Sequence, residues 1–89
     1  MLKAVLIQVF GRVQGVGFRF YTEEKAKEFN IAGFVQNKGD GSVYIEAEGT
    51  ADELDAFVEW CKKGPRWANV RDCIVSEMPP LQRKGFVVR

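Results

Sequence analysis

The residues best suited to chemistry lie in one glycine-rich stretch, residues 11–19, with the sequence Gly-Arg-Val-Gln-Gly-Val-Gly-Phe-Arg. An apolar segment precedes it and a helical pattern follows it. Glycines let successive main-chain N–H groups point into one concavity, and the free N–H groups at a helix start carry partial positive charge. Arg19 adds a planar guanidinium that suits two phosphate oxygens. The residues expected to bind phosphate are Gln14, Gly15, Val16, Gly17, Phe18 and Arg19.

The stretch lacks two common nucleotide-binding motifs, and their absence bears on the kind of anion that it could bind. No Lys-Ser or Lys-Thr pair follows a glycine as in a Walker loop, and the G-x-G-x-x-G spacing of dinucleotide sites is absent. These absences favour a small phosphorylated group over a nucleotide. On these residues alone, an ordinary turn followed by a surface arginine is the alternative interpretation.

Length and charge limit the classes of partner. The 89 residues carry a formal net charge of +1, with 46% hydrophobic and 28% charged residues, which predicts a single domain over residues 1–89. A nearly neutral domain has no broad basic surface for nucleic acid or an acidic membrane. The apolar run of residues 2–10 is too short to span a bilayer and has no small-residue cleavage site. We therefore expect a cytoplasmic protein without nucleic-acid or membrane partners. We also expect a monomer.

Histidine is absent, and cysteine occurs only as Cys61 and Cys73. The common zinc ligand sets are therefore out of reach, and so are the nucleophile pairs that depend on a histidine base. We expect no metal site. Both cysteines are interpreted as buried thiols, with a disulfide between them as the alternative.

Hydropathy patterns divide the chain into strands and helices. A run that is apolar almost without alternation predicts a central first strand, and apolar residues at helical spacing predict the helix that follows the glycine stretch. Thr50 and Glu53 form a capping box at the start of a second helix, which Gly64-Pro65 ends. The predicted strands cover residues 3–10, 31–37, 42–48, 68–77 and 85–89, and the predicted helices cover residues 18–29 and 51–63.

This order predicts an α+β fold, the ferredoxin-like β-α-β-β-α-β sandwich, with an antiparallel sheet, two helices on one face and a short C-terminal strand. In the third strand Val43, Ile45 and Ala47 should face the helices, while Tyr44, Glu46 and Glu48 should face away. The fold hosts enzymes, RNA binders and effector-binding domains, so it does not define a function by itself.

Four motifs give the chain a resemblance to the acylphosphatase family. They are residues 11–19, Gly33-Phe34-Val35-Gln36-Asn37, Asp40-Gly41-Ser42-Val43 and Gly64-Pro65. The resemblance spans nearly the whole chain and implies a hydrolase without metal or cofactor. Its substrate would be an acyl phosphate, a carboxyl–phosphate anhydride, cleaved to a carboxylate and inorganic phosphate, with phosphate or sulfate as competitors. The resemblance also implies that Arg19 binds the phosphate and that Asn37 orients the attacking water.

Some features depart from this resemblance or allow another interpretation. Gln36 stands where an arginine is common in the family, and Asn30-Ile31-Ala32 replaces a glycine-containing helix end. Asn37 alone is typical of a turn residue beside glycines. Larger carbamoyl-transfer maturation proteins also begin with such a domain, but we expect a free-standing enzyme because the chain starts with Met1 and finishes soon after its last predicted strand.

Two other functions fit the same fold. An RNA-recognition module would need aromatic and basic residues on its first and third strands, whereas residues 43–48 provide one aromatic and two acids. An effector-binding regulatory domain would normally be tethered to an enzyme, and neither end of the chain resembles a linker. The enzyme interpretation is therefore preferred.

Overall fold

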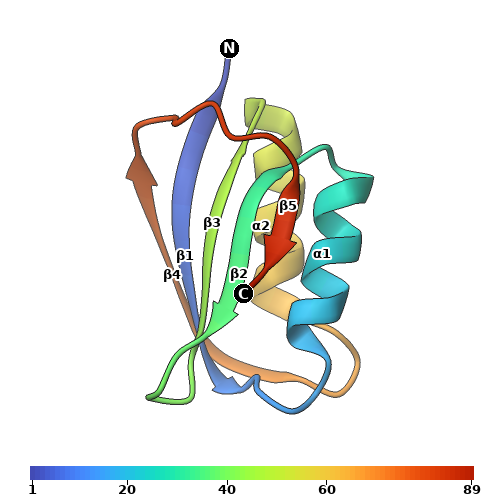
Figure 1. Ribbon diagram of the computed structural model, residues 1–89. Helices are drawn as coiled ribbons and strands as arrows, with labels where there is room; N and C mark the ends of the chain where they lie inside the picture. Colours follow the sequence, from blue (N-terminus) through green and yellow to red (C-terminus); the bar gives the residue numbers. More distant parts are fainter.

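The computed structural model describes all 89 residues and contains one five-stranded sheet with both helices on the same face (Figure 1). The strand order across the sheet is β4-β1-β3-β2-β5. This arrangement confirms the predicted ferredoxin-like fold, in which β3 lies between β1 and β2. The elements are β1 (Lys3–Arg12), α1 (Phe18–Glu28), β2 (Ala32–Asn37), β3 (Val43–Gly49), α2 (Ala51–Lys63), β4 (Asn69–Met78) and β5 (Phe86–Val88).

The sheet is mixed because of its last strand. Strands β1, β3, β2 and β4 pair antiparallel as expected, but β5 pairs in parallel with β2, with Gly33 opposite Phe86. The chain leaves β4 at the end of the sheet where β2 begins and crosses there, so β5 runs in the direction of β2 (Figure 1). The end of β5 therefore lies beside the end of β2, on the side of the molecule where the glycine-rich stretch also lies.

The crossing segment changes the environment of one predicted surface residue. Val43, Ile45 and Ala47 are buried as expected, whereas Glu48 on the opposite face is also buried. Its carboxylate accepts hydrogen bonds from the N–H groups of Leu81 at 2.8 Å and Arg83 at 3.2 Å. Alternation within a strand indicates which face a side chain takes, but not whether a distant loop covers that face.

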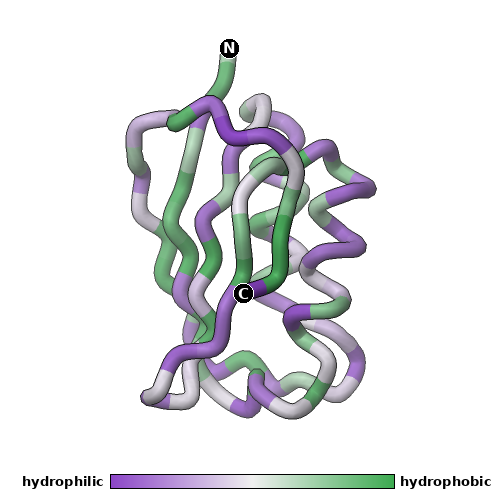
Figure 2. Tube along the Cα trace, viewed as in Figure 1, coloured by the Kyte–Doolittle hydropathy of each residue, from purple (hydrophilic) through white to green (hydrophobic).

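The core lies between the sheet and the helices, and the apolar segments of β1, β2 and β3 cluster accordingly (Figure 2). Helix α2 contributes Leu54, Phe57 and Cys61, all buried. Its predicted capping box is present, because Thr50 Oγ1 accepts from the Glu53 N–H and the Glu53 carboxylate accepts from the Thr50 N–H at 3.2 Å. The latter bond is the main cause that lowers the pKa of Glu53.

Both cysteines are free thiols as expected, and Cys61 is buried, whereas Cys73 is only partly buried. Burial raises the pKa of each thiol, that of Cys61 well above its usual range. Neither helix is long and apolar enough to cross a membrane.

Gly11 belongs to β1 rather than to the loop, because the strand extends two residues beyond its predicted end at Phe10. The pairing with β4 shifts register between Phe10 and Gly11, and Gly11 has φ 127°. A side chain there would overlap the main-chain oxygen of Asn69. The first glycine of the stretch therefore allows a bulge in the sheet, and the loop proper begins after Arg12.

Candidate active site

The loop between β1 and α1 presents unbonded main-chain donors. Gly15 and Gly17 adopt left-handed conformations with φ 74° and 80°, and Gly17 is the N-cap of α1 without a side-chain cap. None of the N–H groups of residues 15–20 donates a hydrogen bond within the protein. A run of free donors at a helix start forms an anion-binding site when the side chains around it leave space.

Such space exists beside this loop. A cavity of about 350 Å³ lies where β1 and β2 end, against the first turns of α1. Arg19 and Asn37, which belong to different elements, both line this cavity. The other lining residues are Val13, Gly15, Gly17, Phe18, Phe20, Glu23 and Val88.

The Arg19 side chain is held in place by a hydrogen bond to Arg89, the last residue of the sequence. One guanidinium nitrogen, Nη1, donates a hydrogen bond of 2.9 Å to the main-chain oxygen of Arg89. The Arg89 N–H donates to the Val35 oxygen at 2.8 Å, so this acceptor is attached to β2. Arginine carries several N–H donors, and the remaining ones are available to an anion in the cavity.

Asn37 is the last residue of β2, and its side-chain oxygen Oδ1 is buried without a hydrogen-bond donor from the protein. A buried oxygen of this kind is costly unless a donor reaches it. The turn after Asn37 is closed by a 2.9 Å bond from the Lys38 N–H to the Ser42 oxygen. Asp40 accepts from the Ser42 hydroxyl at 2.6 Å and from its N–H at 2.9 Å, which lowers the pKa of Asp40. The position of Asn37 is thus fixed by a well-bonded turn.

The predicted site residues divide into two groups. Gly15, Gly17, Phe18, Arg19 and Asn37 line the cavity, whereas Gln14 and Val16 do not. The Phe18 side chain is buried in the core, so Phe18 can serve an anion only through its main chain.

The side chain of Gln14 is turned toward the Lys38–Ser42 turn, where its amide nitrogen donates to both of those carbonyl oxygens. Its side chain is therefore engaged away from the cavity.

Four lining residues were not among the predicted site residues: Val13, Phe20, Glu23 and Val88. Glu23 lies one helical turn after Arg19, a spacing that places both side chains on the same side of α1. Val88 could not be identified, since no local pattern indicates which strand β5 joins.

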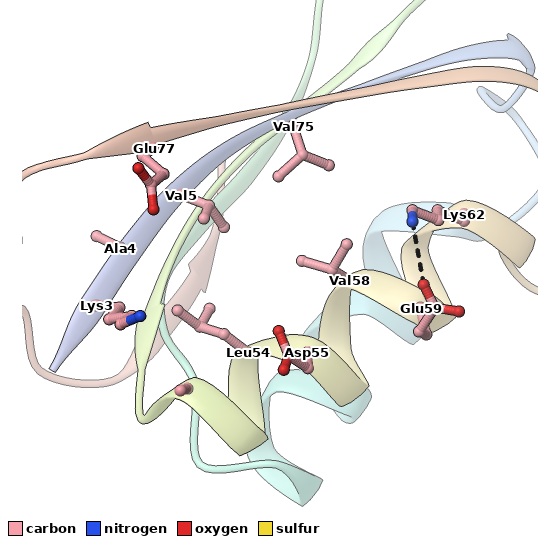
Figure 3. Close-up of a pocket in the computed structure, with 11 residues that line it drawn as sticks. Lys3, Ala4, Val5, Leu54, Asp55, Val58, Glu59, Lys62, Val75 and Glu77 are labelled. Atoms are coloured by element: carbon pink, nitrogen blue, oxygen red, sulfur yellow. Dashed lines mark ion pairs between the residues drawn. The ribbon is translucent and has the colours of Figure 1, made fainter. Parts of the chain in front are cut away.

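A larger hollow of about 480 Å³ lies elsewhere, between α2 and strands β1 and β4 (Figure 3). Val5, Leu54, Val58 and Val75 point into it, and the ion pair between Lys62 and Glu59 lies at its edge at 3.1 Å. It contains neither an arginine nor a glycine-rich loop. Size alone therefore does not locate the chemistry, and the smaller cavity with its free donors is the candidate site.

The structure is that of a small α+β protein in which free N–H groups at a helix start, an arginine and an asparagine line one cavity. The family model described as acylphosphatase matches residues 5–88. The acylphosphatase of Bifidobacterium longum is 47% identical over 85 residues, which cover 93% of this chain and 88% of that protein. The crystal structure of the Bacillus subtilis acylphosphatase has a TM-score of 0.94 and 41% identity, covering 100% of this chain and 99% of that one. The chain belongs to the acylphosphatase family and is a hydrolase.

The same domain also occurs as part of a longer protein. The crystal structure of full-length HypF in its phosphate- and nucleotide-bound form has a TM-score of 0.89 and 32% identity, covering 100% of this chain but 12% of that one. By contrast, the acylphosphatase of a Nocardioides species is 42% identical over 89 residues, which cover 90% of its length. The whole chain thus matches relatives of its own size.

Proposed function

We propose that this chain hydrolyses acyl phosphates with the phosphate held by Arg19 and the loop amides and the attacking water oriented by Asn37. The observations that carry the proposal are that Arg19 and Asn37 line one cavity and that the buried Oδ1 of Asn37 has no hydrogen-bond donor within the protein. Family membership supports the reaction class, and the geometry supports these particular roles.

The phosphate is held by two kinds of donor. The free N–H groups of residues 15–19 face the non-bridging oxygens, and the Arg19 guanidinium donates to two of them. In phosphoryl transfer the charge on these oxygens must be neutralised as the bond to the leaving group lengthens. The role of the loop is therefore electrostatic, and it requires no proton transfer.

The attacking water is oriented by a neutral group. Asn37 Oδ1 accepts one hydrogen bond from the water, which satisfies the buried oxygen and directs a lone pair of the water toward phosphorus. Little proton removal is needed early in a loose transition state, so an orienting carboxamide suffices, as glutamine does in GTPases.

The leaving group explains why a chain without histidine can perform the reaction. The water oxygen forms a bond to phosphorus while the anhydride P–O bond breaks, and the electron pair of that bond leaves on the carboxylate oxygen. A carboxylate is a weak base and departs without being protonated. The protons of the water pass to phosphate and solvent, and neither a metal nor a cofactor is needed.

The acyl half of the substrate lies at the rim of the cavity. Phe20 and Val88 line the cavity while remaining 58% and 41% exposed, so they form part of its mouth. Glu23 adds a carboxylate on the same side. These residues favour an uncharged apolar acyl group and oppose one that carries a further negative charge.

The exposed sheet face gives little support to RNA binding. Phe34 is buried under Arg89, whose guanidinium carbon lies 4.0 Å from the ring centroid. Tyr44 donates its hydroxyl to Glu46 at 2.7 Å and packs against Phe34. This aromatic pair is therefore not free to stack on bases.

The test is hydrolysis of benzoyl phosphate by the purified chain in the presence of EDTA. We expect turnover without added metal, competitive inhibition by inorganic phosphate and sulfate, and no effect of EDTA. A chain that leaves benzoyl phosphate and acetyl phosphate uncleaved, or that cleaves them only after a metal is added, would contradict the proposal.

A further inference from the structure

Gln14 connects the phosphate loop to the turn that follows Asn37. Its amide nitrogen Nε2 donates hydrogen bonds of 2.8 Å to the main-chain oxygen of Lys38 and 2.9 Å to that of Ser42. Lys38 directly follows Asn37, and Ser42 closes the same turn. Gln14 itself directly precedes Gly15, whose N–H is one of the free donors. One side chain thus joins the two halves of the candidate site.

The two hydrogen bonds use both hydrogens of the Gln14 side-chain amide. A primary carboxamide nitrogen carries two hydrogens, and here each has its own acceptor. Both bonds are short, and Ser42 is buried, so water does not readily replace them. The loop otherwise forms no hydrogen bond through its N–H groups at residues 15–20. Gln14 is therefore the side-chain contact that sets the loop against the turn.

We propose that Gln14 is a positioning residue that fixes the separation and angle between the phosphate-holding amides and Asn37, and so aligns the attacking water with phosphorus. The inference rests on the proposed function, because it assigns the alignment of that reaction to one side chain. In-line transfer depends steeply on alignment, and a displacement of about 1 Å can cost on the order of a hundredfold in rate.

This role predicts a specific kinetic signature. The phosphate is bound by the loop amides and Arg19, which remain when Gln14 is changed. Asn37, however, loses its fixed position relative to them. Loss of Gln14 should therefore lower kcat and leave the affinity for phosphate nearly unchanged. A phosphate-binding role for the Gln14 side chain would produce the opposite pattern.

The test compares Gln14→Ala and Gln14→Glu with the parent in kcat for benzoyl phosphate and in the inhibition constant of inorganic phosphate. The glutamate variant keeps the side-chain length but places oxygens against the two carbonyl oxygens. We expect kcat to fall roughly tenfold to a hundredfold, with the inhibition constant changed by less than about twofold. Gln36→Ala is the matched control, because Gln36 adjoins Asn37 yet makes no side-chain hydrogen bond and does not line the cavity.

A double variant separates positioning from general loss of structure. If Gln14 acts through Asn37, adding Gln14→Ala to Asn37→Ala should lower kcat by less than about twofold. Equal losses in both backgrounds, or a weakened phosphate affinity with kcat retained, would overturn the inference.

The hydrogen bonds of Gln14 can also be tested without any variant. If the Gln14 variants do not fold, hydrogen exchange of the Gln14 side-chain amide in the parent decides the geometry. Protected amide hydrogens support the connection, and hydrogens that exchange as in a free glutamine overturn it. Failure of the proposed function can be told apart from failure of the inference about Gln14, because in the first case the parent itself would not hydrolyse benzoyl phosphate.

Discussion

The Arg19 guanidinium donates a 2.9 Å hydrogen bond to the main-chain oxygen of Arg89, a residue 70 positions later in the chain. This bond joins the first turn of α1 to the residue that follows β5. Because the Arg89 N–H is bonded to Val35 of β2, the acceptor moves with the sheet. The orientation of Arg19 is therefore set by the sheet as well as by its own helix.

Replacement of Arg19 by lysine tests whether the planar guanidinium matters beyond its charge. A lysine ammonium cannot hold the Arg89 oxygen and two phosphate oxygens in one plane. We expect Arg19→Lys and Arg19→Ala to lower kcat/KM for benzoyl phosphate on the order of a hundredfold or more, about 2.7 kcal/mol. Steady-state kinetics measure the effect.

Arg12→Lys is the control for the arginine series, because Arg12 belongs to the same stretch but is exposed and lies outside the cavity. It should retain the parent kcat/KM. Parent-like activity in Arg19→Lys would show that a point charge is enough and that the guanidinium fork is not used.

Removal of the Asn37 side chain should act on turnover rather than on binding. Asn37→Ala keeps the phosphate donors and loses the group proposed to orient water. We expect kcat to fall on the order of a hundredfold, with the phosphate inhibition constant nearly unchanged. Asn69→Ala, at an exposed position outside the cavity, should behave like the parent. An unchanged kcat in Asn37→Ala would remove Asn37 from the reaction.

The two residues proposed for the reaction, which the structure brings to one cavity, could be singled out because each lies at a local pattern. Arg19 follows glycines at a predicted helix start, and Asn37 closes a predicted strand before a glycine-rich turn. Hydropathy periodicity was likewise enough for the strands, the helices and their order. The resemblance to a family supplied the roles, which the residue types alone left open for Asn37.

The long-range features could not be predicted from local patterns. The parallel pairing of β5 with β2 brings Val88 to the cavity and the Arg89 oxygen to Arg19, yet residues 85–89 contain no signal for their partner strand. The hydrogen bonds of Gln14 span 24 and 28 residues and depend on how the loop folds back. Such contacts are set by tertiary packing rather than by periodicity.

The selectivity for the acyl group should respond to Glu23. Its carboxylate at the cavity repels an acyl group that carries a second negative charge, so Glu23→Gln should raise kcat/KM for succinyl phosphate relative to benzoyl phosphate. Because the site is partly exposed, we expect roughly a twofold to fivefold change. Assays with both substrates measure the ratio.

Glu24→Gln is the matched control, since Glu24 is the adjacent exposed acid and does not line the cavity. The ratio of the two substrates should stay at the parent value there. A ratio that is unchanged in Glu23→Gln would place the acyl group away from this carboxylate.

Ionisation of the Tyr44 hydroxyl should lower the free energy of unfolding at alkaline pH. Burial, followed by the hydrogen bond to Glu46, raises the pKa of Tyr44 to about 12. The ordinary pKa of tyrosine is about 10, so between about pH 10 and pH 12 Tyr44 loses its hydroxyl proton in the unfolded chain but keeps it in the folded state. The folded state therefore becomes less stable as the pH rises through this range. Tyr44→Phe should lack this part of the pH dependence when unfolding by urea is measured.

The ionisation itself can be followed separately. Tyrosine occurs twice in the chain, so in a Tyr21→Phe variant Tyr44 is the one remaining tyrosine. Its phenolate absorbance should rise well above pH 10, near pH 12. A midpoint at the ordinary tyrosine value would mean that Tyr44 is neither shielded nor hydrogen-bonded in solution.

Attack of water at phosphorus, with the phosphate held between Arg19 and Asn37, is tested most directly by hydrolysis of benzoyl phosphate in water enriched in ¹⁸O. Mass spectrometry of the two products shows which bond is broken. We predict that the label from water enters inorganic phosphate and that benzoate remains unlabelled. Label in benzoate would mean attack at the carbonyl carbon, which would contradict the roles assigned to the loop, Arg19 and Asn37.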